Sequence, residues 1–95
     1  MEFDIVLVNS NAIAVISVKK KVHKNDIKDL AKRALPFFKK NFKEFKNYKL
    51  YGAIASKNFP IEFEKVAAEN GMFAITQAGQ KFQVLNKKGF KGKCF

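Results

Sequence analysis

The sequence is poor in several residue types, and each shortage excludes a class of protein. Cys94 is the single cysteine and there is one histidine, so a disulfide scaffold and a Cys/His zinc site are both excluded. Two prolines and five glycines beside a hydrophobic content of 47% exclude a disordered chain. No apolar run approaches the roughly 18–20 residues of a membrane span. Met1–Asp4 lacks the basic start of a signal peptide, so we expect a soluble, cytoplasmic protein with Cys94 as a reduced thiol.

Acidic residues are also scarce. Eight Asp and Glu stand against 19 Lys and Arg, which gives a formal net charge of +11 in 95 residues. This length allows one small domain, and eleven Phe are available for its core. A strongly basic protein favours a polyanionic partner, most often nucleic acid. Small basic proteins also bind ribosomes or anionic lipid, so the charge alone leaves the partner open.

The hydrophobic pattern predicts a single α/β domain with the element order β-β-α-β-α-β-β and one mixed sheet. Strands are expected at 3–8, 12–18, 48–55, 72–76 and 81–85. The first two form a hairpin around the turn cluster at 9–11. The second strand is apolar at nearly every position, which predicts burial on both of its faces beneath flanking helices.

Two helices connect these strands. Apolar residues recur at three- and four-residue steps from Ile27 to Phe45, which predicts an amphipathic helix capped at Asn25 or Asp26. Pro36 predicts a kink or a break within it. A second helix is expected to open at 59–60 and to end at 70–71, where Asn-Gly is a typical C-terminal cap. The domain is therefore expected to cover 1–86, followed by a basic, frayed tail at 87–95.

The polar residues of the first hairpin carry the strongest functional signal. Side chains alternate along a strand, so Glu2 and Asp4 share a face, as do Ser17 and Lys19. A hairpin loop with an even number of residues would place Asp4 opposite Ser17 and Glu2 opposite Lys19, on one side of the sheet. An odd loop would separate Asp4 from Ser17, so the cluster depends on the register.

This arrangement resembles the PD-(D/E)XK endonuclease-like superfamily. The resemblance rests on Asp4 in a strand, a turn, the triplet Ser17-Val18-Lys19 at the end of the next strand, and a basic helix after it. The segments 48–55 and 69–73 look like later elements of uncharacterised microbial members, so the resemblance covers 2–86. It implies a nuclease-like core that lacks the usual N-terminal helix and strand. Either the domain is truncated, or a second copy covers the exposed sheet edge as a homodimer.

The resemblance also implies roles for individual residues. In active members the Asp and the acid of the triplet hold Mg²⁺, and the Lys helps to position or activate water. Asp4 then looks like the metal ligand and Lys19 like the lysine of the triplet, which makes both candidate catalytic residues. Ser17 stands where the acid is expected and supplies no charge. Some members recruit a carboxylate from the following helix, where Asp26 and Asp29 are the candidates, although their spacing is not a close match.

Three functions from different classes remain open. The leading one is a nuclease-like domain with a degraded metal centre that binds nucleic acid, DNA in the first place. Its phosphate contacts would come from a cluster of lysines: Lys19, Lys20, Lys21, Lys24 and Lys28. The second is a weak Mg²⁺-dependent endonuclease that uses Asp4, Lys19 and a relocated carboxylate. The third is a homodimerising structural remnant with no role in nucleic-acid binding.

Simpler interpretations accompany each of these residues. Asp4 could be a paired charge at the sheet edge, Ser17 a small residue in a packed strand, and 19–21 a solvated strand exit. His23 is expected to be solvated in a basic loop. The helical spacing of Phe38, Phe42 and Phe45 predicts core packing, because base-stacking aromatics more often lie exposed on a sheet.

Overall fold

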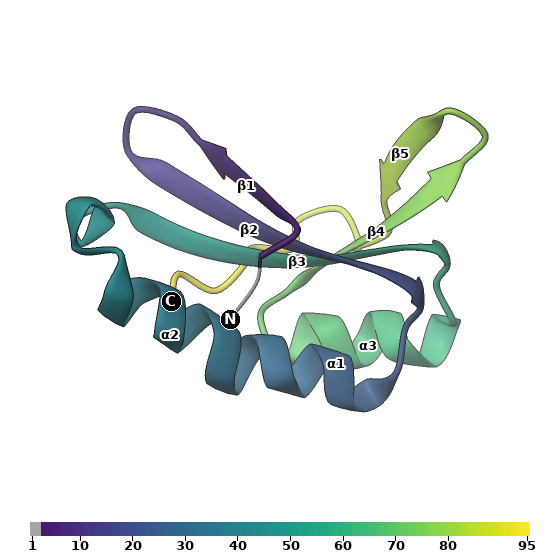
Figure 1. Ribbon diagram of the computed structural model, residues 1–95. Coiled ribbons are helices and arrows are strands. Elements are labelled where there is room, and N and C mark those ends of the chain that lie inside the picture. The colour runs from purple at the N-terminus through teal and green to yellow at the C-terminus, as the bar shows by residue number, and fades with distance from the viewer. Residues whose placement is uncertain (1–2) are drawn as a thin grey trace.

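A computed structural model describes residues 3–95 as one α/β domain with a five-stranded mixed sheet (Figure 1). The strands are β1 (Ile5–Val8), β2 (Ala12–Lys21), β3 (Lys49–Asn58), β4 (Phe73–Ala78) and β5 (Lys81–Val84). They lie side by side in chain order. The central pairs β2–β3 and β3–β4 are parallel, and the outer pairs β1–β2 and β4–β5 are antiparallel hairpins. The predicted order of elements is confirmed.

The helical segment between β2 and β3 changes its winding before the proline. It consists of α1 (Lys24–Asp29), the π-helix η1 (Leu30–Ala34), α2 (Leu35–Asn41) and the 3₁₀ turn η2 (Lys43–Phe45). The N–H of Leu35 donates to the carbonyl of Leu30, five residues back, just before Pro36 enters α2. Proline has no N–H to continue the α-helical pattern, and the wider turn accommodates this gap. The predicted interruption therefore takes the form of a π-helical stretch rather than a chain break.

The predicted cap at Asn25 or Asp26 is wrong, because α1 begins at Lys24 and its N-cap is His23. Asp26 acts from within the first turn, where its Oδ2 accepts the backbone N–H of His23 at 2.8 Å. A carboxylate in the first helical turn can satisfy such a free donor from inside the helix. The second crossover helix, α3 (Ile61–Glu69), follows Pro60 and ends at Asn70 as expected, with Gly71 at a positive φ of 75°.

All helices lie on one face of the sheet, below it in Figure 1. Burial on both faces of β2 was predicted and is wrong: Ile13 and Val15 are buried against the helices, whereas Ala14 and Ile16 are half-buried and Val18 is exposed. The two parallel crossovers step in the same direction along the sheet, and crossovers of one hand then place their helices on the same side. The other face consequently has no helical cover.

The segment after β5 is not frayed. The N–H of Phe95 donates to the carbonyl of Leu50 at 2.8 Å, and that of Lys93 donates to the carbonyl of Gly71 at 3.0 Å. Phe95 also packs against the hydrophobic core. Because β4 begins to pair with β3 only at Ala53, the tail occupies the position beside the first residues of β3. Backbone groups that an edge would leave unpaired are thereby satisfied.

The edge strand β1 is exposed at all four positions. The homodimer predicted to form through this edge stays a prediction. No helix within residues 3–95 is long and apolar enough to cross a membrane.

Candidate functional site

The hairpin has the register on which the predicted cluster depends. Ile5 pairs with Ile16 and Val8 with Ile13, and the N–H of Asn9 donates to the carbonyl of Ala12 at 3.0 Å. The loop therefore has two residues, and the even-loop register on which the cluster depends is confirmed. Asp4 lies one residue before β1, and it lines the same pocket as Ser17. The side chain of Asn9 holds the turn, because its Oδ1 accepts the N–H groups of the two residues after Ser10 at 3.0 and 2.7 Å. The predicted pairing of Glu2 with Lys19 lies outside the described residues.

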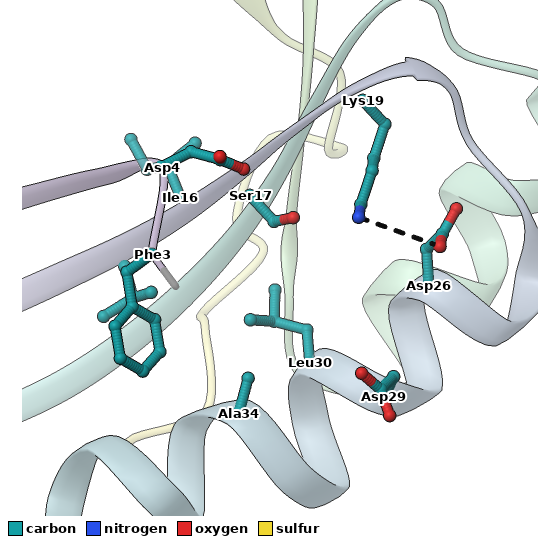
Figure 2. A pocket seen from close by; sticks show the side chains of 10 residues that line it. Phe3, Asp4, Ile16, Ser17, Lys19, Asp26, Asp29, Leu30 and Ala34 are labelled. Carbon is teal, nitrogen blue, oxygen red and sulfur yellow. Dashed lines mark ion pairs between the residues drawn. The ribbon is translucent and has the colours of Figure 1, made fainter. Parts of the chain in front are cut away.

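A pocket of about 130 Å³ opens between this hairpin and α1 (Figure 2). Its polar lining consists of Asp4, Ser17, Lys19, Asp26 and Asp29. Ser17 and Lys19 come from β2, Asp4 from the residue just before β1, and both remaining aspartates from α1. The pocket therefore contains every residue that the nuclease resemblance singled out in the hairpin, together with both candidates for a relocated carboxylate.

Each carboxylate in the pocket already has a protein partner. Asp4 Oδ2 accepts the backbone N–H of Val18 at 2.8 Å. Asp26 Oδ1 lies 4.0 Å from the ammonium of Lys19, as the dashed line in Figure 2 marks, and its Oδ2 caps the start of α1. Asp29 forms an ion pair with Arg33 one turn along the helix, at 3.2 Å. One oxygen of Asp4 is left without such a partner in the part of the chain that is described.

Protein partners weaken this donor set as a Mg²⁺ centre. Mg²⁺ requires near-octahedral oxygen coordination and is usually held by one or two carboxylates with water. Ser17 is uncharged, and Lys19 places a cation beside Asp26. Across residues 3–95 there is no group of three or more His, Cys, Asp or Glu side chains arranged to hold a metal ion. The pocket thus brings together three carboxylates, each of which already has a protein partner.

The predicted lysine cluster is gathered at one end of the sheet but is divided between its faces. Lys19 and Lys21 alternate with Lys20 along β2, so Lys19 reaches the pocket while Lys20 lies on the opposite face. Lys24 is exposed at the start of α1, and Lys28 is half-buried one turn later. The five lysines therefore surround the end of β2 instead of forming a single patch.

Two residues that the sequence reasoning missed adjoin Lys20. Lys57 lies next to it on β3, since Lys19 pairs with Ser56 and Lys21 with Asn58. A groove of about 470 Å³ lies beside these two lysines, and Phe82, on β5, lines it together with them. The polar–apolar alternation of 81–84 indicates that Phe82 and Val84 share one face of the sheet. Nothing in the local sequence indicates that this face adjoins the end of β2.

The chain matches no family model, and neither a curated protein nor a solved structure matches it.

Proposed function

We propose that the protein binds nucleic acid, DNA in the first place, as a nuclease-like domain whose metal centre is incomplete. The observation that carries this proposal is the surplus of positive charge around the end of β2. Within residues 3–95, Lys19 alone among the five predicted lysines has a carboxylate within 4.0 Å. Lysines without carboxylate partners are free to neutralise phosphates, and the release of counterions then favours binding.

The nuclease-like part of the proposal is supported by the hairpin. Asp4 and Ser17 line one pocket, and Lys19 lines it two residues further along β2. A helix follows directly and supplies Asp26. The metal ligands of this nuclease-like domain are incomplete, because Ser17 stands where an acid is expected and Lys19 pairs with Asp26. The hairpin and the helix that surround the pocket are retained.

A Mg²⁺-dependent endonuclease is the second candidate. Asp26 favours it, because this carboxylate lines the pocket from the helix where the resemblance leads one to expect a relocated acid. Incubation of the protein with supercoiled DNA and Mg²⁺ distinguishes the two candidates. Nicking that is abolished by Asp4→Asn would favour the enzyme, whereas binding without nicking would favour the incomplete centre.

Binding itself is tested by fluorescence anisotropy of a labelled duplex over a series of salt concentrations. The logarithm of the binding constant should fall linearly with the logarithm of salt, at a slope of about −0.9 per phosphate neutralised. The double variant Lys20→Glu/Lys21→Glu should weaken binding to every duplex sequence. The control Lys43→Glu/Lys46→Glu changes the same charge at η2, beside the opposite end of the sheet, and should have a smaller effect.

Two results would contradict the proposal. Equal losses in the two double variants would mean that only the total charge matters, and that the end of β2 is not a binding surface. No binding at low salt, together with a dimer in sedimentation, would favour the homodimerising remnant instead.

A further inference from the structure

The sheet face that carries no helices, here named the open face, is mainly apolar, and the strand residues described on it include no acidic one. Its strand residues, assigned by alternation from the register, are Ile5, Leu7, Ala12, Ala14, Ile16, Val18, Lys20, Lys49, Tyr51, Ala53, Ala55, Lys57, Phe73, Ile75, Gln77, Phe82 and Val84. Large apolar side chains are well exposed here, with Leu7 at 55%, Val84 at 54% and Phe82 at 72%. Apolar exposure of this kind on one continuous face is typical of a binding surface.

The open face is concave. In Figure 1 the β1–β2 and β4–β5 hairpins rise on either side of the uncovered middle strands. A hollow of about 300 Å³ lies over the middle of the sheet, lined among others by Ile16, Tyr51 and Phe73. The groove of about 470 Å³ follows it at the ends of the parallel strands and is lined by Lys20, Lys57, Gln77 and Phe82 among others. The concave surface thus passes from an apolar centre to a cationic end.

Two lysines stand side by side at that cationic end. Lys20 and Lys57 occupy neighbouring positions on adjacent parallel strands, whose backbones are about 4.8 Å apart. The backbone carbonyl of each lysine accepts a hydrogen bond from a hydroxyl group on the neighbouring strand. Ser56 Oγ donates to the carbonyl of Lys20 at 3.2 Å, and Thr76 Oγ1 donates to that of Lys57 at 3.0 Å.

Like charges on neighbouring strands are unfavourable unless an anion lies between them. Neither Lys20 nor Lys57 has a carboxylate within 4.0 Å among residues 3–95, and the open face offers none. The pair is therefore a cationic site whose repulsion an external anion would relieve.

Phe82 adds an exposed aromatic ring to this cationic site. It is exposed on the wall of the same groove, beside the amide of Gln77. An exposed aromatic ring on a sheet is a stacking surface for a nucleobase, and flanking cations contact the phosphates. Bases of a duplex are stacked on each other, so their planes can reach such a ring only in a single strand.

We propose that the open face binds single-stranded nucleic acid, with a base stacked on Phe82 and phosphates on Lys20 and Lys57. This inference rests on the proposed function, because Lys20 belongs to the lysines on which nucleic-acid binding depends. It adds a substrate class and a second surface, on the side of the sheet away from the pocket of Asp4 and Lys19.

A second copy of this chain fits the open face less well than a polyanion does. A two-fold symmetric interface places the same patch on both partners. Each copy would bring lysines and no carboxylate to that patch, and each carries a net charge of +11. Charge complementarity therefore favours a nucleic-acid strand, whose phosphates match the lysines and whose bases match the apolar surface.

The test uses Phe82→Trp as a reporter, since the chain contains no other tryptophan. Titration with oligothymidine of about 12 nucleotides should quench the fluorescence of this variant through stacking. Phe37→Trp is the control, because Phe37 is an exposed phenylalanine on α2, on the helical side of the sheet, and its reporter should respond little.

Anisotropy then measures the contribution of each contact. Phe82→Ser should weaken binding of the labelled oligothymidine at least about fivefold and leave duplex affinity unchanged. Lys57→Gln should lower the salt slope for the single strand by about 0.7, the change expected for one phosphate contact, whereas the control Lys46→Gln should not.

The outcomes separate this inference from the proposed function. If the protein binds duplex DNA but both Phe82 variants behave like wild type toward oligothymidine, the inference fails and the proposed function stands. If no nucleic acid binds at low salt, both fail. A dimer in sedimentation that Phe82→Ser dissociates, or binding to anionic vesicles that Phe82→Ser abolishes, in place of oligothymidine binding, would also overturn the inference.

Discussion

Asp4 is bound through its side chain to the backbone of Val18, whose N–H donates to Asp4 Oδ2 at 2.8 Å. The carboxylate precedes β1, and the N–H belongs to the far half of β2, so this bond closes the open end of the hairpin. Asp4 therefore already has a structural partner. The simpler interpretation of Asp4 as a paired charge at the sheet edge is modified accordingly, since its closest partner is a backbone donor.

This bond predicts how Asp4 contributes to stability. Asp4→Ala should lower the free energy of unfolding by about 1 kcal/mol, and the melting temperature by roughly 4–8 °C for a domain of this size. Asp4→Asn keeps an acceptor oxygen and should lose less than half as much. Thermal melts followed by circular dichroism measure both; equal losses in the two variants would show that the charge, rather than the acceptor, matters.

Replacement of Ser17 tests whether the pocket can regain a metal centre. Ser17→Glu places a further carboxylate in the pocket that Asp4 and Asp26 also line. A divalent cation would then bind the folded state, so millimolar Mn²⁺ should raise the melting temperature of the variant more than that of the wild type. Ser17→Gln is the matched uncharged control. An equal response to Mn²⁺ in Ser17→Glu and Ser17→Gln would mean that Asp4 and Ser17 do not cooperate as ligands.

Close packing above the middle of β3 predicts a sensitive glycine. A Cβ added to Gly52 would lie 2.5 Å from Met72 Sδ and 2.6 Å from Leu35 Cδ1. Gly52→Ala should therefore destabilise the protein by about 1–3 kcal/mol through overpacking. Urea denaturation measures this loss. In the double variant with Met72→Ala the combined loss should be smaller than the sum of the two single losses; strict additivity would contradict the packing argument.

Anchoring of the C-terminal segment predicts that Phe95 contributes to stability. Its ring packs against the core, and its N–H is bonded to Leu50. Phe95→Ala should reduce the free energy of unfolding by about 1–2 kcal/mol, less than for a fully buried phenylalanine. The exposed neighbour Cys94 provides the control, because Cys94→Ala should leave the urea midpoint unchanged. A midpoint for Phe95→Ala that equals the wild-type value would show that the segment is not anchored in solution.

Local signals led to the hairpin and to its candidate residues, but they left the loop length open. In the structure the side chain of Asn9 holds a two-residue turn, and alternation then puts Ser17 and Lys19 on the side of the sheet that faces the pocket. The helical spacing of the phenylalanines likewise led to the core, where Phe38 and Phe42 stack at 4.5 Å between ring centroids. These features depend on residues close in sequence, so the pattern contained the information.

Features that depend on distant segments were not accessible in this way. The apolar run of β2 is the same whether its second face is covered by a helix or left open, so Ile16 and Val18 gave no warning of an uncovered face. Lys57 meets Lys20 only because β3 pairs with β2 in parallel. The anchoring of Phe95 to Leu50 joins residues that lie far apart in the chain, and no local preference predicts it.

The parallel pairing of β2 with β3 also sets the order in which the molecule can fold. Ala12 pairs with Lys49, so the whole helical crossover must be spanned before the middle of the sheet can form. The two hairpins, by contrast, each close across a short turn. Contacts between distant segments are slow to form because the intervening loop must first be closed, whereas hairpins form within microseconds. Refolding should therefore be limited by the step in which β3 pairs with β2 of one hairpin and β4 of the other.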